Sequence, residues 1–311
     1  MATIFIADEI RELLPGRALE GHDVQWLPGT AATPTGSYEA LVPLLSRAIG
    51  PTELDGAPNL RIVANCAVGT DNIDLVAARE RGVIVTNTPG VLTEATADLT
   101  WALILAVARR LKEGAALLAE RQWDGWHPTQ LLGLELSGAT LGIVGAGRIG
   151  QAVGRRAVPF GLRIVYHARN RKREFERETG AAWAPLAQLL ERCDVVTLHV
   201  PSTDETRGII GAAEFGRMRP GAILINTARG DLVDECAMID SLAAGHLGGA
   251  GLDVFQREPR VPGALIEHPR VVTLPHLGSA TTSTRRAMAE LAVANVRSVL
   301  AGGEALTPVD D

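Results

Sequence analysis

The sequence predicts a two-domain α/β protein built on parallel sheets. Short runs rich in β-branched residues alternate with longer helical patterns, and several runs are apolar throughout, as expected for strands covered on both faces. Two long helical patterns, over 94–120 and 282–300, interrupt this alternation. We therefore expect one domain over 96–281 and a second, discontinuous domain over 1–95 and 282–311.

The individual elements follow from the same alternation. The expected strands are 3–7, 60–66, 82–87, 140–145, 162–167, 194–200, 222–227 and 270–275. Helices are expected between them, for instance over 74–81 and 151–160. The segment PGTAATPTGS (28–37) is rich in Pro, Gly, Thr and Ser and is typical of a loop.

Composition excludes several classes of protein. The 311 residues carry a formal net charge of −6 and a pI near 5.7, which disfavours a general nucleic-acid binder. The longest apolar stretch, Trp101–Ala108, is far shorter than the roughly 20 residues that span a membrane, and the N-terminus lacks the pattern of a signal peptide. Three separated cysteines favour neither a disulfide framework nor a zinc site. We expect a cytoplasmic protein without a metal.

A glycine-rich turn follows the expected strand 140–145. Gly145, Gly147 and Gly150 have the spacing G-x-G-x-x-G and open an expected helix. The first glycine permits a tight turn, the second lets the backbone approach a pyrophosphate, and the third lets helix and strand pack closely. The N–H groups at the start of the helix, around Arg148 and Ile149, favour phosphate. The pattern predicts a Rossmann-type dinucleotide-binding domain.

A basic cluster follows where NAD-binding proteins carry an acidic residue. A carboxylate about twenty residues after the glycine turn usually binds the adenosine ribose. Here that count leads to Ala168, followed by Arg169, Asn170 and Arg171. Guanidinium groups pair with a 2′-phosphate, whereas a carboxylate would repel it. We predict that these three residues bind NADPH or NADP, with NADH or NAD still possible; the alternative is a solvated charge run on a loop.

Five further segments strongly resemble motifs of the D-isomer-specific 2-hydroxyacid dehydrogenases. They are NCAVGTDNID (65–74), NTPGVLTEATAD (87–98), NTARGDLVDE (226–235), GAGLDVFQREP (249–259) and LPHLGSAT (274–281). WDGWHPTQLLGLEL (123–136) and the YHARNRK loop are most similar to the glyoxylate/hydroxypyruvate reductase branch. The resemblance implies a flavodoxin-like substrate-binding domain and a homodimer. The family usually places a helix where residues 28–37 leave little room for one.

The resemblance also implies the residues that carry the chemistry. His276 matches the acid/base residue, and imidazole is the side chain that titrates near neutral pH. Glu258 matches its partner, which stabilises the imidazolium form. Arg229 matches the residue that binds the substrate carboxylate and carbonyl with a planar fork. Further N–H groups for that carboxylate are expected from Ala67, Val68 and Gly69.

Other cofactor contacts are implied by their positions in the matched motifs. They are Thr96, His199, Val200, Pro201, Thr206, Thr227, Ala228, Asp253, His276 and Gly278. His199 is a rival to His276, because it too ends an expected strand, but the resemblance favours His276. For Asp253 the alternative is a buried acid that caps a turn.

The expected activity is NADPH-preferring reduction of a small 2-oxo acid, glyoxylate or hydroxypyruvate, to a 2-hydroxy acid. An NAD-linked D-lactate-type dehydrogenase is the alternative that the missing acid at Ala168 disfavours. Phosphite dehydrogenases resemble this chain but carry a lysine in the loop formed here by 67–69. This loop reads Ala-Val-Gly, so the phosphite alternative is disfavoured. A dinucleotide-sensing, co-repressor-like binding protein would need an exposed partner groove, which the sequence does not indicate. The sequence does not rank glyoxylate above hydroxypyruvate.

Overall fold

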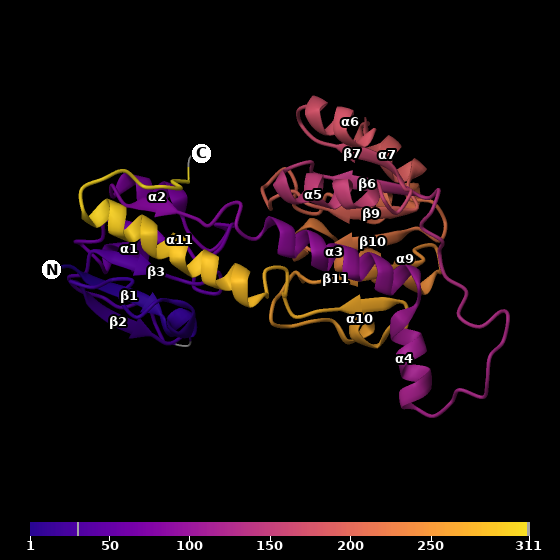
Figure 1. The fold of residues 1–311 in the computed structure, drawn as a ribbon, viewed down its shortest axis with the longest axis horizontal. Helices are drawn as coiled ribbons and strands as arrows, with labels where there is room; N and C mark the ends of the chain where they lie inside the picture. The colour runs from indigo at the N-terminus through magenta and orange to yellow at the C-terminus, as the bar shows by residue number, and fades with distance from the viewer. Residues whose placement is uncertain (30, 310–311) are drawn as a thin grey trace. The chain divides into compact units, whose positions relative to one another are not determined.

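The computed structural model describes residues 1–29 and 31–309, and the chain divides into two compact units (Figure 1). The first unit is Met1–Leu92 with Ser279–Asp311, and the second is Thr93–Gly278. The divisions fall at 92/93 and 278/279, where we expected 95/96 and 281/282. Every pairing between the strands described is parallel. The predicted α/β class is confirmed.

The first unit is built on a sheet whose described strands have the order β2-β1-β3-β4-β5, the flavodoxin-like order. The strands are β1 (Thr3–Ala7), β2 (Asp23–Leu27), β3 (Ala40–Val42), β4 (Ile62–Ala64) and β5 (Ile84–Thr86). The helices are η1 (Asp8–Leu13), α1 (Pro51–Asp55), α2 (Leu75–Glu80) and α11 (Thr282–Leu300). Residues 28, 29 and 31–39, between β2 and β3, form no helix, so the expected loop is confirmed for the part described.

Apolar side chains on the sheet of the first unit hold its helices in place. Val63 of β4 and Val85 of β5 share a buried core with Leu54 of α1 and Ala78 of α2. Helix α11 packs against β3 and β4, and Thr281 caps it by accepting the N–H of Thr284 at 3.2 Å. The predicted helix over 282–300 is therefore confirmed at both ends.

The second unit, all of whose residues are described, has the strand order β12-β11-β10-β9-β6-β7-β8. Its strands are β6 (Thr140–Val144), β7 (Arg163–His167), β8 (Ala182–Trp183), β9 (Val195–Leu198), β10 (Ile223–Asn226), β11 (Gly249–Leu252) and β12 (Val271–Thr273). Its helices are α3 (Thr93–Ala108), α4 (Leu111–Ala119), α5 (Arg148–Ala157), α6 (Arg173–Thr179), α7 (Leu186–Arg192), α8 (Ala212–Arg217), η2 (Gly230–Leu232), α9 (Glu235–Ala243) and α10 (Gly263–Glu267). The strand order reverses between β6 and β9, which is where Rossmann-type sheets bind ligands.

Alternating side chains on these strands bury both faces of the sheet. Ile223 and Ile225 of β10 join the core that contains α3 and α5 residues, whereas Leu224 joins the core that contains α8 and α9 residues. Successive residues of a strand point to opposite faces, so an apolar run covers both at once. This explains why continuous apolar runs predicted these strands.

The single long helix expected over 94–120 is wrong, because the structure has two helices there. Arg110 adopts a left-handed conformation (φ 54°), and its side chain binds Glu113 in the first turn of α4. The N–H of Leu134 donates to the carbonyl of Ala108 at 2.8 Å, so a residue outside the helix occupies the last carbonyl of α3. The apolar run Trp101–Ala108 ends α3, and none of the described helices is long and apolar enough to cross a membrane.

Four strands were not expected, and each has a physical reason. β2 and β8 are edge strands with exposed or polar residues, and β3 has three residues only. β11 contains two glycines, which disfavour strands. A Cβ on Gly251 would lie 2.9 Å from Leu103 Cβ of α3, so glycine is needed where this helix approaches the sheet.

The cysteines form no disulfide. Cys66 and Cys193 are buried and Cys236 is exposed, and all three are free. Burial raises the pKa of Cys66 to about 11 and the pKa of Cys193 to about 12, so both thiols stay protonated at neutral pH. Within the described ranges no group of three or more His, Cys, Asp or Glu side chains is arranged to hold a metal.

Candidate active site

The predicted site residues of the second unit follow the carboxyl ends of neighbouring strands. His199 follows β9, Arg229 follows β10, Asp253 and Glu258 follow β11, and His276 follows β12. These strands are adjacent in the parallel sheet, so the segments after them meet at one edge. The structure therefore brings together residues that are far apart in the sequence.

His276 and Glu258 form a hydrogen-bonded pair. The imidazole Nδ1 lies 2.9 Å from Glu258 Oε2, and Glu258 Oε1 accepts the N–H of Phe255 at 3.0 Å. Burial opposes ionisation of this carboxyl, but the bond to His276 and the positive charges of His276 and Arg229 outweigh it, so the pKa of Glu258 is lowered. An ionised Glu258 holds a proton on Nδ1 and turns Nε2 into the free proton-transfer position.

Asp253 holds the turn that carries His276. Its carboxylate is fully buried and accepts the N–H groups of Leu277 at 2.6 Å and Gly278 at 2.8 Å, while its carbonyl accepts that of His276 at 2.9 Å. His276 has φ 56°, a left-handed conformation that is costly for a residue with a Cβ. Burial raises the pKa of Asp253, although these N–H donors oppose the shift. Asp253 therefore caps this turn, and its predicted contact with the cofactor stays a prediction.

The backbone around Arg229 is fixed by Asn226 at the end of β10. Asn226 Nδ2 donates to the carbonyl of Arg229 at 2.7 Å, and its Oδ1 accepts the N–H of Ala228 at 3.0 Å. Thr227, between them, is buried and hydrogen-bonded to Thr100 of α3 at 2.9 Å. The guanidinium of Arg229 donates to the carbonyl of Ala228 at 2.6 Å and lies close enough to Glu258 to lower the pKa of its carboxyl.

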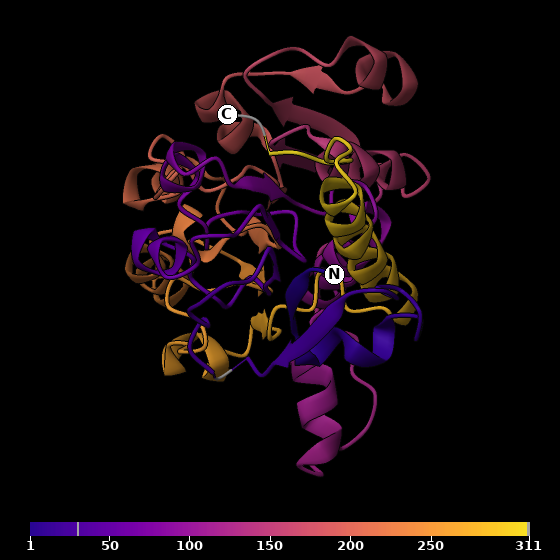
Figure 2. The ribbon, with the colours of Figure 1, turned by 90° about the vertical axis from the view of Figure 1, so that its left-hand side faces the viewer.

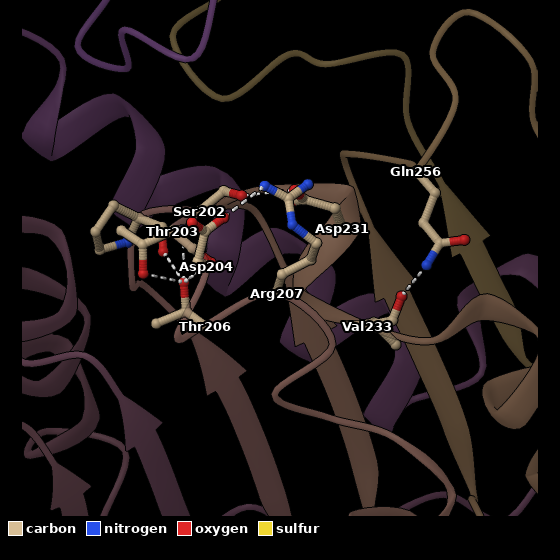
Figure 3. A network of polar contacts seen from close by, with 9 residues as sticks. Ser202, Thr203, Asp204, Thr206, Arg207, Asp231, Val233 and Gln256 are labelled. Atoms are coloured by element: carbon tan, nitrogen blue, oxygen red, sulfur yellow. Dashed lines mark hydrogen bonds and ion pairs between the residues drawn. The ribbon is translucent and has the colours of Figure 1, made fainter. Parts of the chain in front are cut away.

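Asp231 ties the loop after β9 to the Arg229 turn (Figure 3). Its Oδ2 accepts the hydroxyl of Ser202 at 2.5 Å and Arg207 Nη1 at 3.1 Å. Within the loop, Thr206 donates to the carbonyl of Pro201 at 2.6 Å and accepts the N–H of Thr203 at 2.8 Å. Thr206 thus shapes the loop that carries Val200 and Pro201, and the predicted cofactor contact of all three stays a prediction.

His199 differs from His276 in its surroundings. Its Nε2 is paired with the buried hydroxyl of Thr197 at 2.9 Å, and burial lowers the pKa of His199 to about 3. A neutral imidazole at physiological pH is not a proton donor of the kind that carbonyl reduction needs. The structure therefore favours His276 over its rival.

The burial of neutral His199 predicts a pH-dependent stability. The folded pKa lies below the ordinary 6.5, so its stabilising contribution is present above pH 6.5 and is lost as the pH falls toward about 3. Each pH unit of that difference is worth about 1.4 kcal/mol. We expect His199→Gln to make the free energy of unfolding, measured by urea denaturation, fall less steeply over this range. The exposed His127→Gln is the control, and equal slopes for His199→Gln and wild type would contradict the assignment.

The glycine turn has the geometry that its three roles require. Gly145 has φ 99°, and a Cβ on Gly150 would lie 2.1 Å from the carbonyl oxygen of Gly145. At Gly147 a Cβ would meet nothing within 4 Å, and this residue caps α5, next to the exposed Arg148 and the half-buried Ile149. Tight turn, close packing and an open approach to a helix N-terminus thus occur where expected, and the residues fit a pyrophosphate.

Three residues of the first unit were predicted to bind the substrate carboxylate, and their carbonyls are all held. Asn65 Nδ2 donates to the carbonyl of Gly69 and Asn87 Nδ2 to that of Val68, both at 2.8 Å, and Thr88 N–H donates to that of Ala67 at 2.9 Å. Among the described residues none accepts the N–H groups of Ala67, Val68 or Gly69. The segment therefore offers donors to an anion.

Thr96 and Gly278 lie beside Asp253. A Cβ on Gly278 would lie 3.3 Å from Asp253 Oδ2 and 3.6 Å from the Thr96 side chain, so little space is left there. The sequence patterns assigned no role to Asn226, Asn65 or Asn87, although each fixes a predicted segment. All three open matched motifs, which was the available indication.

Comparisons with known proteins place the chain among NAD(P)-dependent oxidoreductases. The model of the "D-isomer specific 2-hydroxyacid dehydrogenase, NAD binding domain" matches residues 101–278, within the second unit. A glyoxylate reductase of Thermococcus litoralis is 50% identical over 262 residues, which cover 83% of this chain and 79% of that protein. The chain therefore belongs to the D-isomer specific 2-hydroxyacid dehydrogenase family, in its glyoxylate reductase branch.

Solved structures agree with this placement. A protein of Thermus thermophilus is 46% identical with a TM-score of 0.90, and the match covers all of both chains. An NADPH-dependent glyoxylate/hydroxypyruvate reductase from Sinorhizobium meliloti, solved with NADP and malonate, is 36% identical with a TM-score of 0.88 over 99% of this chain and 96% of that one. The family and branch that the sequence motifs indicated are thus confirmed.

Proposed function

We propose that the protein reduces small 2-oxo acids, glyoxylate and hydroxypyruvate among them, to 2-hydroxy acids and prefers NADPH as the reductant. The hydrogen bond between His276 Nδ1 and Glu258 carries the proposal, because it leaves Nε2 as a proton donor beside Arg229. Similarity to the Thermococcus litoralis and Sinorhizobium meliloti reductases supports the choice of substrates.

His276 serves as the acid of this reaction. A bound nicotinamide cofactor would supply the hydride that the carbonyl carbon of the substrate receives. His276 Nε2–H gives its proton to the carbonyl oxygen as negative charge develops there, and Glu258 stabilises the imidazolium before the transfer. In the reverse direction the neutral imidazole takes the proton from the hydroxyl group.

Arg229 binds the substrate carboxylate and polarises the carbonyl. A planar guanidinium can form two parallel hydrogen bonds to a carboxylate, which fixes orientation as well as charge. In the first unit, the N–H groups of residues 67–69 are further donors for an anion, since the carbonyls of these residues are already held by Asn65, Asn87 and Thr88. We accordingly assign the cofactor and the catalytic residues Arg229, Glu258 and His276 to the second unit, and propose that residues 67–69 of the first unit contribute to substrate binding.

The basic cluster supports the preference for NADPH. Arg169 and Asn170 are exposed directly after β7, the position at which a ribose-binding acid stands in NAD-linked enzymes. The glycine turn of the neighbouring strand β6 would bind the pyrophosphate, so the 2′-phosphate would meet this cluster. An NAD-linked D-lactate-type enzyme binds a cofactor without a 2′-phosphate, so cations at this position would have no phosphate to bind.

Initial rates test the proposal. We expect turnover of glyoxylate and of hydroxypyruvate with NADPH, and a kcat/KM for NADPH about tenfold or more above that for NADH, because charge-assisted hydrogen bonds contribute about 1.5–3 kcal/mol. Turnover with NADH alone would keep the enzyme class and refute the cofactor preference. No turnover with either reductant would refute these substrates and favour the sensing role.

We further propose a homodimer formed through α4 and the segment that follows it. Helix α4 buries none of its residues and projects from the rest of its unit in both views (Figures 1 and 2). Large apolar side chains are exposed here, with Trp126 at 79%, Leu132 at 64% and Leu118 at 62%. Exposed apolar surface of this kind favours association, and a second copy of the chain is the partner that the family implies.

A further inference from the structure

The loop that carries the basic cluster, residues 168–172 (the basic loop), is tied to the structure at both ends. Trp183 of β8 donates its indole N–H to the carbonyl of Ala168 at 3.0 Å. At the other end the N–H of Lys172 donates to the hydroxyl of Tyr166 at 2.6 Å. The residues between these ties, Arg169 to Arg171, are therefore presented on a fixed loop.

Tyr166 also places a carboxylate beneath this loop. The tyrosine is fully buried, its ring meets Phe175 edge-on at 5.6 Å, and its hydroxyl donates to Glu176 Oε1 at 2.6 Å. Only 16% of the Glu176 side chain is exposed, compared with 55% of that of Arg171. A negative charge thus lies next to the loop that we propose for the 2′-phosphate.

Arg171 neutralises that charge. Its Nε donates to Glu176 Oε1 and its Nη2 to Oε2, both at 3.0 Å, which is a two-point pairing. The same two donors cannot at once form a two-point pairing with a phosphate. Arg169 is exposed, and no ion pair joins it to another described residue. The two arginines of the cluster therefore have different surroundings.

We propose that Arg171 is a positioning residue for cofactor specificity: it neutralises the carboxylate of Glu176 beside the basic loop, while Arg169 and Asn170 bind the 2′-phosphate. The inference rests on the proposed preference for NADPH, and it changes the role first predicted for Arg171. Without Arg171, the carboxylate of Glu176 would repel the phosphate, and NADPH would be disfavoured for a reason other than a lost contact.

The experiment compares Arg169→Ala, Arg171→Ala, Glu176→Gln and the double variant Arg171→Ala/Glu176→Gln. The Kd values of NADPH and NADH are measured without substrate, by calorimetry, on the whole chain. Glu176→Gln removes the charge but keeps an oxygen that can accept the hydroxyl of Tyr166. The control is Arg155→Ala. Arg155 Nε pairs with both oxygens of Glu178, at 2.9 and 2.8 Å, and Glu178 lies on α6, the helix that also carries Glu176.

We expect Arg171→Ala to raise the Kd of NADPH about tenfold and that of NADH less than about twofold, since only the first carries the extra phosphate charge. The double variant should return to within about threefold of wild type, because the repelling charge is gone. A double variant that binds NADPH as poorly as Arg171→Ala would show that Arg171 is a direct phosphate ligand and would overturn the proposal. Equal effects of Arg171→Ala on both cofactors, or the same NADPH-selective loss in Arg155→Ala, would also overturn it.

Arg169→Ala separates this inference from the proposed function. If wild type prefers NADPH and Arg169→Ala loses that preference, the cofactor proposal stands whatever the double variant shows. If wild type binds both cofactors equally and Arg169→Ala changes neither Kd, the NADPH preference is wrong and the role of Arg171 falls with it.

Discussion

Replacing His276 by alanine is expected to lower kcat/KM for glyoxylate by about 10²–10⁴-fold, the usual contribution of general acid catalysis. The imidazole is the only group of the His276–Glu258 pair with a proton to give, since the pKa of Glu258 is lowered and the carboxylate is ionised at neutral pH. The loss should appear in kcat, while the Kd of NADPH measured without substrate should stay near wild type.

Two further variants make the result at His276 specific. Glu258→Gln keeps an acceptor for Nδ1 but removes the charge that stabilises imidazolium, so we expect a smaller fall in kcat than for His276→Ala and a changed pH profile. His22→Gln, at a histidine next to the amino end of β2, should have no effect on kcat/KM. Near-normal turnover by His276→Ala with every 2-oxo acid tried would refute the assignment of the acid.

Replacing Arg229 by lysine is expected to lower kcat/KM for glyoxylate by about 100-fold or more, because a point charge cannot reproduce the planar fork and small misplacements of substrate are costly. The KM should rise as well as kcat fall, since binding and polarisation share one group. Initial rates over a range of glyoxylate concentrations measure both.

The control for Arg229 is Arg219→Lys. Arg219 pairs with Asp194 at 2.6 Å, next to the amino end of β9 and so at the other end of the strand from the candidate site. This variant should keep normal kinetics. If Arg229→Lys behaved like Arg219→Lys, the carboxylate-binding role would have to be given to another residue.

The features that the sequence predicted well depend on local geometry. Gly145, Gly147 and Gly150 lie in one turn. Their spacing alone therefore determines which glycine permits the tight turn, which leaves room for a pyrophosphate and which lets the helix pack on the strand. The catalytic candidates were identified by the resemblance of their motifs, and two of them, Arg229 and His276, follow expected strands whose carboxyl ends lie at one edge of the parallel sheet.

The features that were missed depend on contacts between distant residues. The residue pattern of 94–120 does not show that the N–H of Leu134 binds the carbonyl of Ala108, where α3 ends. The glycines of β11 disfavour a strand until Leu103 of α3 is seen lying against them. Counting charges likewise could not distinguish Arg169 from Arg171, because the difference is made by Glu176 and its contact with Tyr166.

Asp253 has a consequence for any redesign of this enzyme. One buried side chain and its own carbonyl direct three successive amides, those of His276, Leu277 and Gly278. The position of the imidazole therefore depends on Asp253, which follows β11, rather than on the segment after β12 that carries His276. Libraries that vary the exposed Leu277 can leave the orientation of the imidazole intact, whereas an isosteric amide at Asp253 would set an N–H against an N–H and turn the histidine away.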